Sequence, residues 1–191
     1  NIQPVFDSVD SITAGDKTIS LSFSEEIYCT QNLEVQDFKV AVDDREIDLS
    51  NTVVNPSGAN NLKLTPADSS DLEAANKNVK VTIKSSGAAK LVDEAGNQLN
   101  TGNLDDSKII THAEFNADLS TVTVDKNSVI EEQEVLVTVI PKDHYGNNLG
   151  SGENVVVRID GVSSDLEGKI TIIDVEDGSY TALVKMSDAN A

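Results

Sequence analysis

The chain has 191 residues, of which 38% are hydrophobic and 4% aromatic, and it contains no Trp. Its 33 acidic and 14 basic residues give a net charge of −19. This charge repels phosphate groups, and the basic residues are scattered, which argues against binding of nucleic acid or an anionic membrane. No apolar run approaches the roughly 18 to 20 residues of a membrane span, so direct membrane insertion is not expected.

Cys29 is the only cysteine, so no intramolecular disulfide can form and the fold must be held by packing. The sequence starts at Asn1 without a Met or a recognisable signal peptide. We therefore expect the chain to be a piece of a larger protein.

The first hundred residues show the period-two alternation of half-buried strands. Ile19, Leu21 and Phe23 alternate with small hydroxyl residues, which predicts one buried face and one solvated face. The same pattern returns at residues 38–42, 62–64 and 79–83, with turn-forming residues between them. One short helical segment is expected within 68–76, capped by Ser70 or Asp71.

A polar stretch at 101–107 interrupts the alternation and predicts a domain boundary near 111–116. A second series of short strands is expected at 122–124, 135–139, 155–159, 170–172 and 180–186. Short strands at this spacing, separated by Gly and Asn turns, are typical of a sandwich. The sequence thus predicts two domains, residues 1–111 and 112–191, each with its own core. The expected core residues are Ile19, Leu21, Phe23, Val79, Val81 and Ile83 in the first domain and Val137, Val139, Val157, Ile172 and Tyr180 in the second.

Two patterns frame the first segment: residues 19–27 read I-x-L-x-F-S-E-x-I, and residues 91–97 read L-x-D-x-x-G-N. With this opening and this close, the segment resembles the Ig-like repeats of bacterial surface and S-layer proteins. The second segment carries D-x-x-G-N-x-L at 143–149 and, later, D-G-x-Y-x-A at 177–182. With these two motifs in this order it resembles invasin/intimin-type and filamin-like Ig domains.

These resemblances imply an all-β chain built of two tandem immunoglobulin-like Greek-key β-sandwiches. Domains of the second type ordinarily have one more strand after residue 186, and no apolar alternation remains here to supply it. We therefore expect the second domain to lack its last strand. This would leave an open, unpaired edge beside residues 180–186.

The same resemblances imply a structural or adhesive module of an extracellular bacterial surface protein, located at the cell wall or in an S-layer. Its expected partners are neighbouring domains of the same protein, other surface proteins, and host or matrix ligands. A second hypothesis, from a different class, is a noncatalytic accessory module of a secreted polysaccharide-degrading or proteolytic enzyme. Fold does not decide between them.

The two D-x-x-G-N loops are the strongest candidate sites. Asp and Asn side chains stabilise such turns and Gly supplies the positive φ, which is a purely structural explanation. Their oxygens could instead bind Ca²⁺, with Asp93, Asn97, Asp143 and Asn147 as weak candidate ligands. Other acidic clusters could contribute, namely Asp43–Asp44, Asp105–Asp106, and Asp174 with Glu176 and Asp177. No complete calcium-loop spacing is present, so no resident cofactor is predicted.

Catalytic pairs have little support in the sequence. Cys29 with His112 or His144 could act as nucleophile and base, but no motif supports the pair. The carboxylate pairs at 25–26 and 131–132 could serve glycoside hydrolysis, yet the chain lacks the aromatic platforms of a carbohydrate-cleaving site. The sequence therefore predicts no active site and no enzyme.

Overall fold

The structure is a computed structural model that describes residues 2–128, 130, 133–157 and 170–185. The chain divides into two compact units, Asn1–Ala113 and Glu114–Ala191. Each unit is described below by itself. In the part of the chain that the structure describes, no helix is long and apolar enough to cross a membrane.

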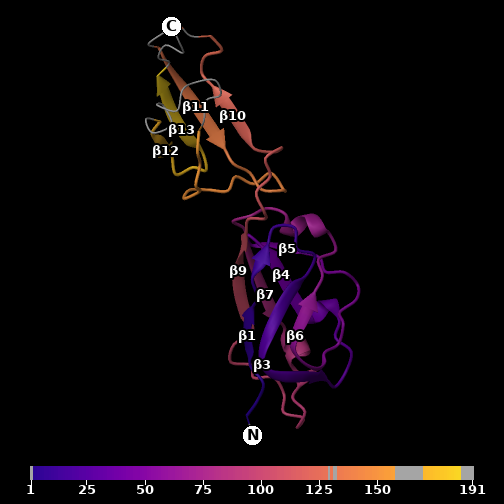
Figure 1. Ribbon diagram of the computed structural model, residues 1–191. Coiled ribbons are helices and arrows are strands. Elements are labelled where there is room, and N and C mark those ends of the chain that lie inside the picture. Colours follow the sequence, from indigo (N-terminus) through magenta and orange to yellow (C-terminus); the bar gives the residue numbers. More distant parts are fainter. Residues whose placement is uncertain (1, 129, 131–132, 158–169, 186–191) are drawn as a thin grey trace. The chain divides into compact units, whose positions relative to one another are not determined.

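The first unit is a sandwich of two sheets (Figure 1). One sheet has the order β1-β3-β6, with β8 also pairing β3, and the other has the order β2-β9-β7-β4-β5. The strands are β1 (Phe6–Val9), β2 (Ile12–Thr13), β3 (Ile19–Cys29), β4 (Phe38–Val42), β5 (Arg45–Ile47), β6 (Ser57–Leu64), β7 (Asn78–Ile83), β8 (Leu91–Val92) and β9 (Asp105–Thr111).

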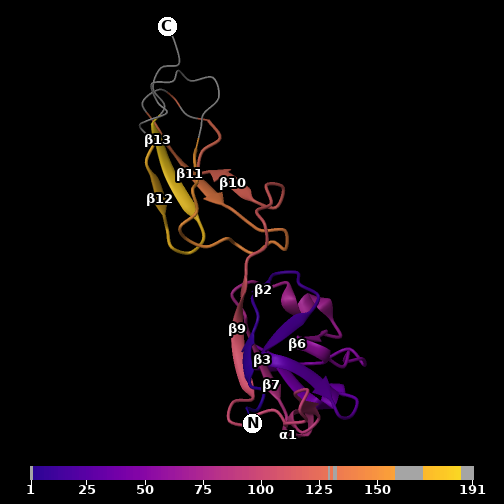
Figure 2. The ribbon, with the colours of Figure 1, turned by 60° about the horizontal axis from the view of Figure 1, so that its bottom comes forward.

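Strand pairing in this unit is antiparallel except between β2 and β9, where Ile12 lies beside Ile110 in a parallel pair. Because β1 belongs to one sheet and β2 to the other, the start of the chain crosses from one layer to the other. Figure 2 shows β3 beside β6 in the first sheet and β9 in the second.

The predicted alternation produces the core of the first unit. Ile19, Leu21 and Phe23 of β3 and the apolar residues of β7 are all at most 3% exposed and share one hydrophobic cluster. The rings of Phe6 and Phe23 lie 5.8 Å apart between their centroids. The expectation that residues 19–23 and 79–83 face a single core is confirmed.

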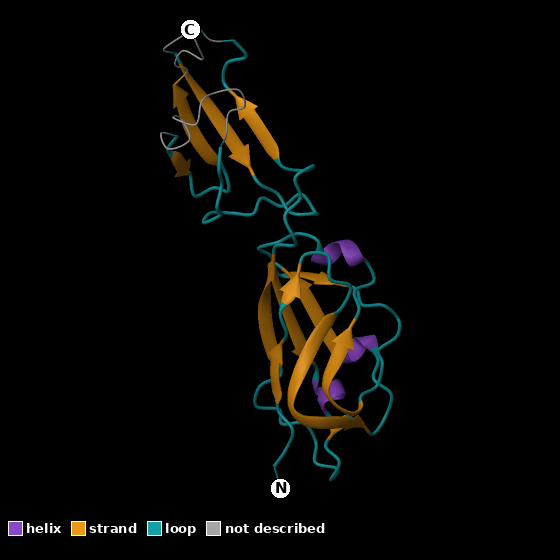
Figure 3. Ribbon diagram, in the orientation of Figure 1, coloured by secondary structure: helices purple, strands orange, loops and turns teal. Residues whose placement is uncertain are grey.

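The described part of the first unit also contains three short helical segments (Figure 3): η1 (Val35–Asp37), η2 (Ser69–Leu72) and α1 (Ser85–Ala88). The expected helix within 68–76 is present as η2. Its cap is Asp68, whose side chain accepts from the Ser70 backbone N–H at 2.9 Å. The prediction of Ser70 or Asp71 as the cap was wrong by two or three positions, because a cap residue must itself be extended, as Asp68 is.

The second unit contains β10 (Thr121–Val124), β11 (Glu134–Ile140), β12 (Ile172–Asp174) and β13 (Tyr180–Lys185). They form one antiparallel sheet in the order β10-β11-β13-β12. This exchange of the last two strands is the A-B-E-D order of an immunoglobulin sheet. The described residues of this unit contain no second sheet. The expected all-β, immunoglobulin-like class is confirmed.

The predicted open edge beside 180–186 is wrong from Tyr180 to Ala182. β13 pairs with β11 from Tyr180 to Lys185 and with β12 from Tyr180 to Ala182, so it is an interior strand over the latter range. On the β12 side of Leu183 to Lys185 the described residues form no pair, so the prediction is not contradicted there. The edges of the sheet are β10 and β12 instead. Met186 lies outside the described residues. The expectation failed because Greek-key order separates the place of a strand in the chain from its place in the sheet.

The strand predicted at 155–159 is not formed at its described positions. Residues 155–157 have no regular structure, and Ile159 lies outside the described residues. Alternation alone does not supply the partner strand whose hydrogen bonds a strand needs.

The core of the second unit is smaller than expected. Tyr180, Ala182, Val184 and Val135 are buried, and the predicted core residues Val137, Val139, Val157 and Ile172 are only half-buried.

Candidate functional site

The two D-x-x-G-N segments fold into the same hairpin. In the first unit, Asp93 N–H donates to Asn97 O at 3.0 Å and Leu99 N–H to Leu91 O at 2.9 Å. In the second, Asp143 N–H donates to Asn147 O at 2.9 Å and the Leu149 N–H to Pro141 O at 3.0 Å. Residues 91–99 and 141–149 therefore share one backbone hydrogen-bond pattern.

A carboxylate closes each hairpin from within. The Asp93 side chain accepts the backbone N–H of Asn97 at 2.7 Å and its side-chain amide at 2.6 Å. The carboxylate of Asp143 accepts the same two groups of Asn147, at 2.9 and 2.8 Å. Gly96 stands at φ 83°, where a side chain would be strained, and the matching glycine of the second hairpin is at φ 80°.

Hydrogen bonding favours the charged form of the Asp93 carboxylate. The Asn97 side-chain amide, with nearby backbone amides, holds the pKa of Asp93 below its ordinary value although burial opposes this. Both aspartates are buried, Asp93 at 7% and Asp143 at 0% exposure. A Ca²⁺ ion would have to compete with these amide donors for the same oxygens. Each Asp–Asn pair lies in its own hairpin, and no cluster of three His, Cys, Asp or Glu fit for a metal occurs among the described residues.

The other acidic clusters also have structural partners. Asp43 accepts from Lys77 Nζ at 2.7 Å and from the Asn78 N–H at 2.9 Å. Asp105 forms an ion pair with Lys80 at 2.7 Å.

In the second unit, Asp174 accepts from two backbone amides, those of Gly152 at 2.8 Å and Glu176 at 2.9 Å. The Asp177 carboxylate bonds both the N–H and the hydroxyl of Ser179. These carboxylates organise turns and strand ends.

A buried polar cluster in the first unit had no sequence signal. Asp37 is 1% exposed and accepts from Lys90 Nζ and from the Ser86 hydroxyl, both at 2.7 Å. Burial alone would raise the pKa of Asp37, but hydrogen bonds from Lys90, from the Glu34 N–H and from Ser86 lower it below its ordinary value. The cluster joins η1 to α1, and its ion-paired residues lie 53 positions apart, so no local pattern could reveal it.

Cys29 is not paired with a histidine. Burial raises the pKa of its thiol to about 11, Lys90 lowers it and Asp37 raises it, so the thiol is neutral at neutral pH. His112 Nε2 lies 3.3 Å from the side-chain amide of Asn76. His144 Nδ1 lies 2.9 Å from that of Asn116. The structure therefore shows no activated nucleophile at Cys29.

Of the two candidate carboxylate pairs, only Glu25–Glu26 lies in the part of the chain that the structure describes. Glu26 accepts a long hydrogen bond from the Tyr28 hydroxyl at 3.4 Å. Glu131 and Glu132 lie outside the described residues.

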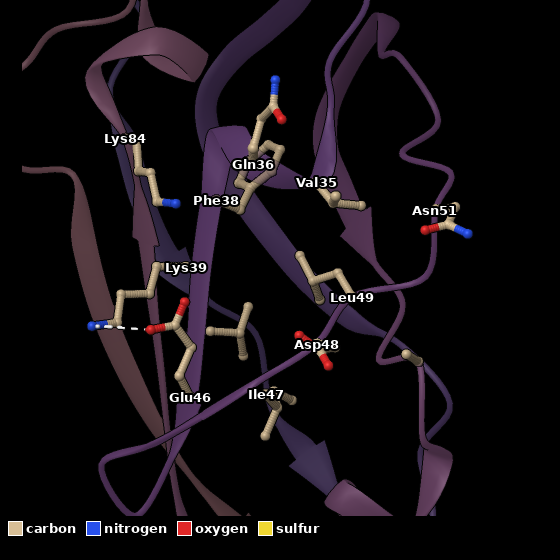
Figure 4. Close-up of a pocket in the computed structure, with 12 residues that line it drawn as sticks. Val35, Gln36, Phe38, Lys39, Glu46, Ile47, Asp48, Leu49, Asn51 and Lys84 are labelled. Carbon is tan, nitrogen blue, oxygen red and sulfur yellow. Dashed lines mark ion pairs between the residues drawn. The ribbon is translucent and has the colours of Figure 1, made fainter.

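A cleft of about 450 Å³ opens in the first unit between β4, η1 and the segment after β5 (Figure 4). Its floor is apolar and its rim polar. The floor is formed by Val35, Phe38, Val40, Ile47 and Leu49, and the rim by Gln36, Lys39, Glu46, Asp48, Asn51 and Lys84, with Ala67 beside them. Nothing in the sequence pattern marked these residues as a group. A smaller apolar pocket of about 270 Å³, lined by Phe115, Val139, Pro141 and Leu149 among others, lies in the second unit.

Comparison with known proteins found no family model and no curated protein that matches the chain. Among solved structures, FdeC, an Escherichia coli adhesin, is similar over 96% of this chain and 55% of its own, at 13% identity and a TM-score of 0.44. The S-layer protein SbsC is similar over 98% of this chain and 26% of its own, at 17% identity and a TM-score of 0.43. Invasin, an integrin-binding bacterial protein, is similar over 97% and 33%, at 15% identity and a TM-score of 0.36. The chain spans about half or less of each of these proteins.

Proposed function

We propose that this chain is a structural or adhesive immunoglobulin-like module of an extracellular bacterial surface or S-layer protein, acting as a spacer or interaction segment. One observation carries the proposal. The described candidate residues that could have formed a catalytic or metal site, such as Asp93, Asp143 and Asp177, accept hydrogen bonds within turns instead. The candidate nucleophile Cys29 is a neutral thiol, and His112 and His144 lie against asparagine side-chain amides.

Such a module works by keeping its fold rigid. Each unit closes a hairpin with a buried aspartate, Asp93 in the first and Asp143 in the second. The first unit also holds η1 through the buried ion pair of Asp37 and Lys90. A scaffold held in this way presents its loops in fixed positions, where they are available to partners. The partners that this role implies are neighbouring domains, other surface proteins, and host or matrix ligands. No observation on the described residues favours the accessory-module alternative.

The proposal is tested on intact cells of the organism that makes the full-length protein. Antibodies raised against this chain should label cells without permeabilisation, and protease added outside should remove the label. An antibody against a cytosolic protein is the matched control and should stain only permeabilised cells. Labelling of the chain only after permeabilisation would contradict the proposal.

A further inference from the structure

The cleft of the first unit exists because the chain turns away from the edge of its sheet after β5. β4 pairs with β7 along its whole length, from Phe38 to Val42, but it pairs with β5 only from Val40 to Val42. After Ile47 the chain turns toward the other sheet, where Leu49 bridges Pro66. The N–H of Ala67 donates to Asp48 O at 2.8 Å and holds the chain after β5 beside the segment that follows β6. A gap therefore opens beside Phe38 and Lys39, at the edge of β4.

Beneath the gap lie buried apolar residues, and the larger apolar side chains that reach its surface are the half-buried Val35 and Leu49. Phe38, Val40 and Ile47 are core residues, at most 5% exposed, and Leu49 packs against the same core. The polar rim comes from separate segments: η1 gives Gln36, β4 gives Lys39, β5 gives Glu46, and the chain after β5 gives Asp48 and Asn51. In Figure 4 the Lys84 side chain extends toward this space from the far side of β4, and Asp48 extends into it below Leu49.

The rim carries no net charge although the chain carries −19. Lys39 and Lys84 are balanced by Glu46 and Asp48, and the Lys39 ammonium lies 3.5 Å from the Glu46 carboxylate. The amides of Gln36 and Asn51 add groups that both donate and accept hydrogen bonds. The rim can thus form hydrogen bonds with a neutral ligand that has both donors and acceptors. An anion would be repelled by the two carboxylates of the rim and by the net negative charge of the chain.

We propose that this cleft binds a neutral saccharide. Hydroxyl groups both donate and accept, which suits the mixed rim, and the C–H face of a sugar ring suits the half-buried side chains of Val35 and Leu49. The volume of about 450 Å³ falls within the range of about 300 to 1,000 Å³ of small-molecule sites. This inference adds a ligand to the module and does not depend on where the module is located.

The test is titration of the full ¹⁵N-labelled chain, followed by amide chemical shifts. The probes are glucose, galactose and N-acetylglucosamine, with glucuronate as the charged comparison and trialanine as a peptide probe. At least one neutral sugar should shift amides in 36–51 and at Lys84 in a saturable manner. Glucuronate and trialanine should bind more weakly than that sugar.

Variants then locate the site. Asp48→Ala and Asn51→Ala should each weaken the binding of that sugar, the former about tenfold because a hydrogen bond to a charged group is lost. Asp7→Ala, which removes an exposed carboxylate from β1, should leave the dissociation constant unchanged. The proposal is overturned if no neutral sugar shifts the cleft amides, if glucuronate or trialanine binds more tightly, or if Asp48→Ala binds as the unaltered chain does.

Discussion

The carboxylate of Asp143 holds both amide groups of Asn147, the backbone N–H at 2.9 Å and the side-chain amide at 2.8 Å. Asp93 holds Asn97 in the same way at 2.7 and 2.6 Å. The two units differ in the rest of their sequence, yet each closes a hairpin with the same pair of Asp–Asn hydrogen bonds. In each, the glycine before the asparagine has a left-handed φ that lets the chain return.

Replacing Asp143 should destabilise the second unit. The change Asp143→Ala removes charged hydrogen bonds from a fully buried position, so we expect a loss of about 2 kcal/mol in the free energy of unfolding. The measurement is urea unfolding followed by NMR signals assigned to residues of that unit. Asp118→Ala, an exposed position, is the control and should change the free energy by less than about 0.5 kcal/mol. Equal effects of the two changes would show that the carboxylate does not hold the hairpin.

Breaking the buried ion pair should destabilise the first unit more strongly. Lys90→Met leaves the Asp37 carboxylate buried without its cation, which costs about 3 kcal/mol. Lys63→Met changes an exposed lysine on β6 and should have little effect. The free energies of unfolding of the two variants are compared by calorimetry or urea unfolding. A Lys90→Met protein as stable as Lys63→Met would refute the structural role of the cluster.

Stability should fall in acid. The folded-state pKa values of Asp37, Asp93 and Asp177 lie below their ordinary values, so protons bind more readily to the unfolded chain. The stabilisation is therefore complete above the unfolded-state pKa of about 3.9 and is lost as pH falls through the lowered folded-state values. Unfolding free energies measured from pH 6 to pH 2 should decline below about pH 4. The decline should be smaller in Lys90→Met, whose Asp37 has lost its cation. A flat profile for the unaltered chain would contradict this.

Cys29 should react slowly with alkylating reagents. Since burial raises its pKa to about 11, only a small fraction is thiolate near pH 8. The rate of reaction with iodoacetamide, followed by mass spectrometry, should reach half of its maximum only near pH 11. The thiol of glutathione is a suitable exposed control and should reach half of its maximum at about pH 8.5, the pKa of an ordinary thiol. A plateau for Cys29 at the same pH as glutathione would show an ordinary, solvated thiol.

The sequence predicted those features that depend on local pattern. Alternation at Ile19, Leu21 and Phe23 was sufficient to place β3 and its buried face, because the side-chain period of a strand is two. The turn residues of 93–97 were recognisable for the same reason: Asp, Gly and Asn act on their own neighbours.

Features that depend on distant partners were missed. The edge expected at Tyr180 became an interior position because β12 and β13 exchange order in the sheet. The pair of Asp37 and Lys90 and the cleft beside Phe38 arise from segments that meet only after folding. Neither the ion pair nor the cleft has a local sequence pattern that would predict it.

The central claim is that the carboxylates of this chain serve its fold rather than a bound metal. The most direct measurement is thermal melting after EDTA treatment, with and without Ca²⁺ at matched ionic strength, with Mg²⁺ as the control for general screening. We predict the same midpoints in EDTA, Ca²⁺ and Mg²⁺. A site for Ca²⁺ in the folded state alone would add about 2.7 kcal/mol at 100 times its Kd. A midpoint that rises in Ca²⁺ but not in Mg²⁺, and that loses this rise in Asp93→Asn or Asp143→Asn, would contradict the account.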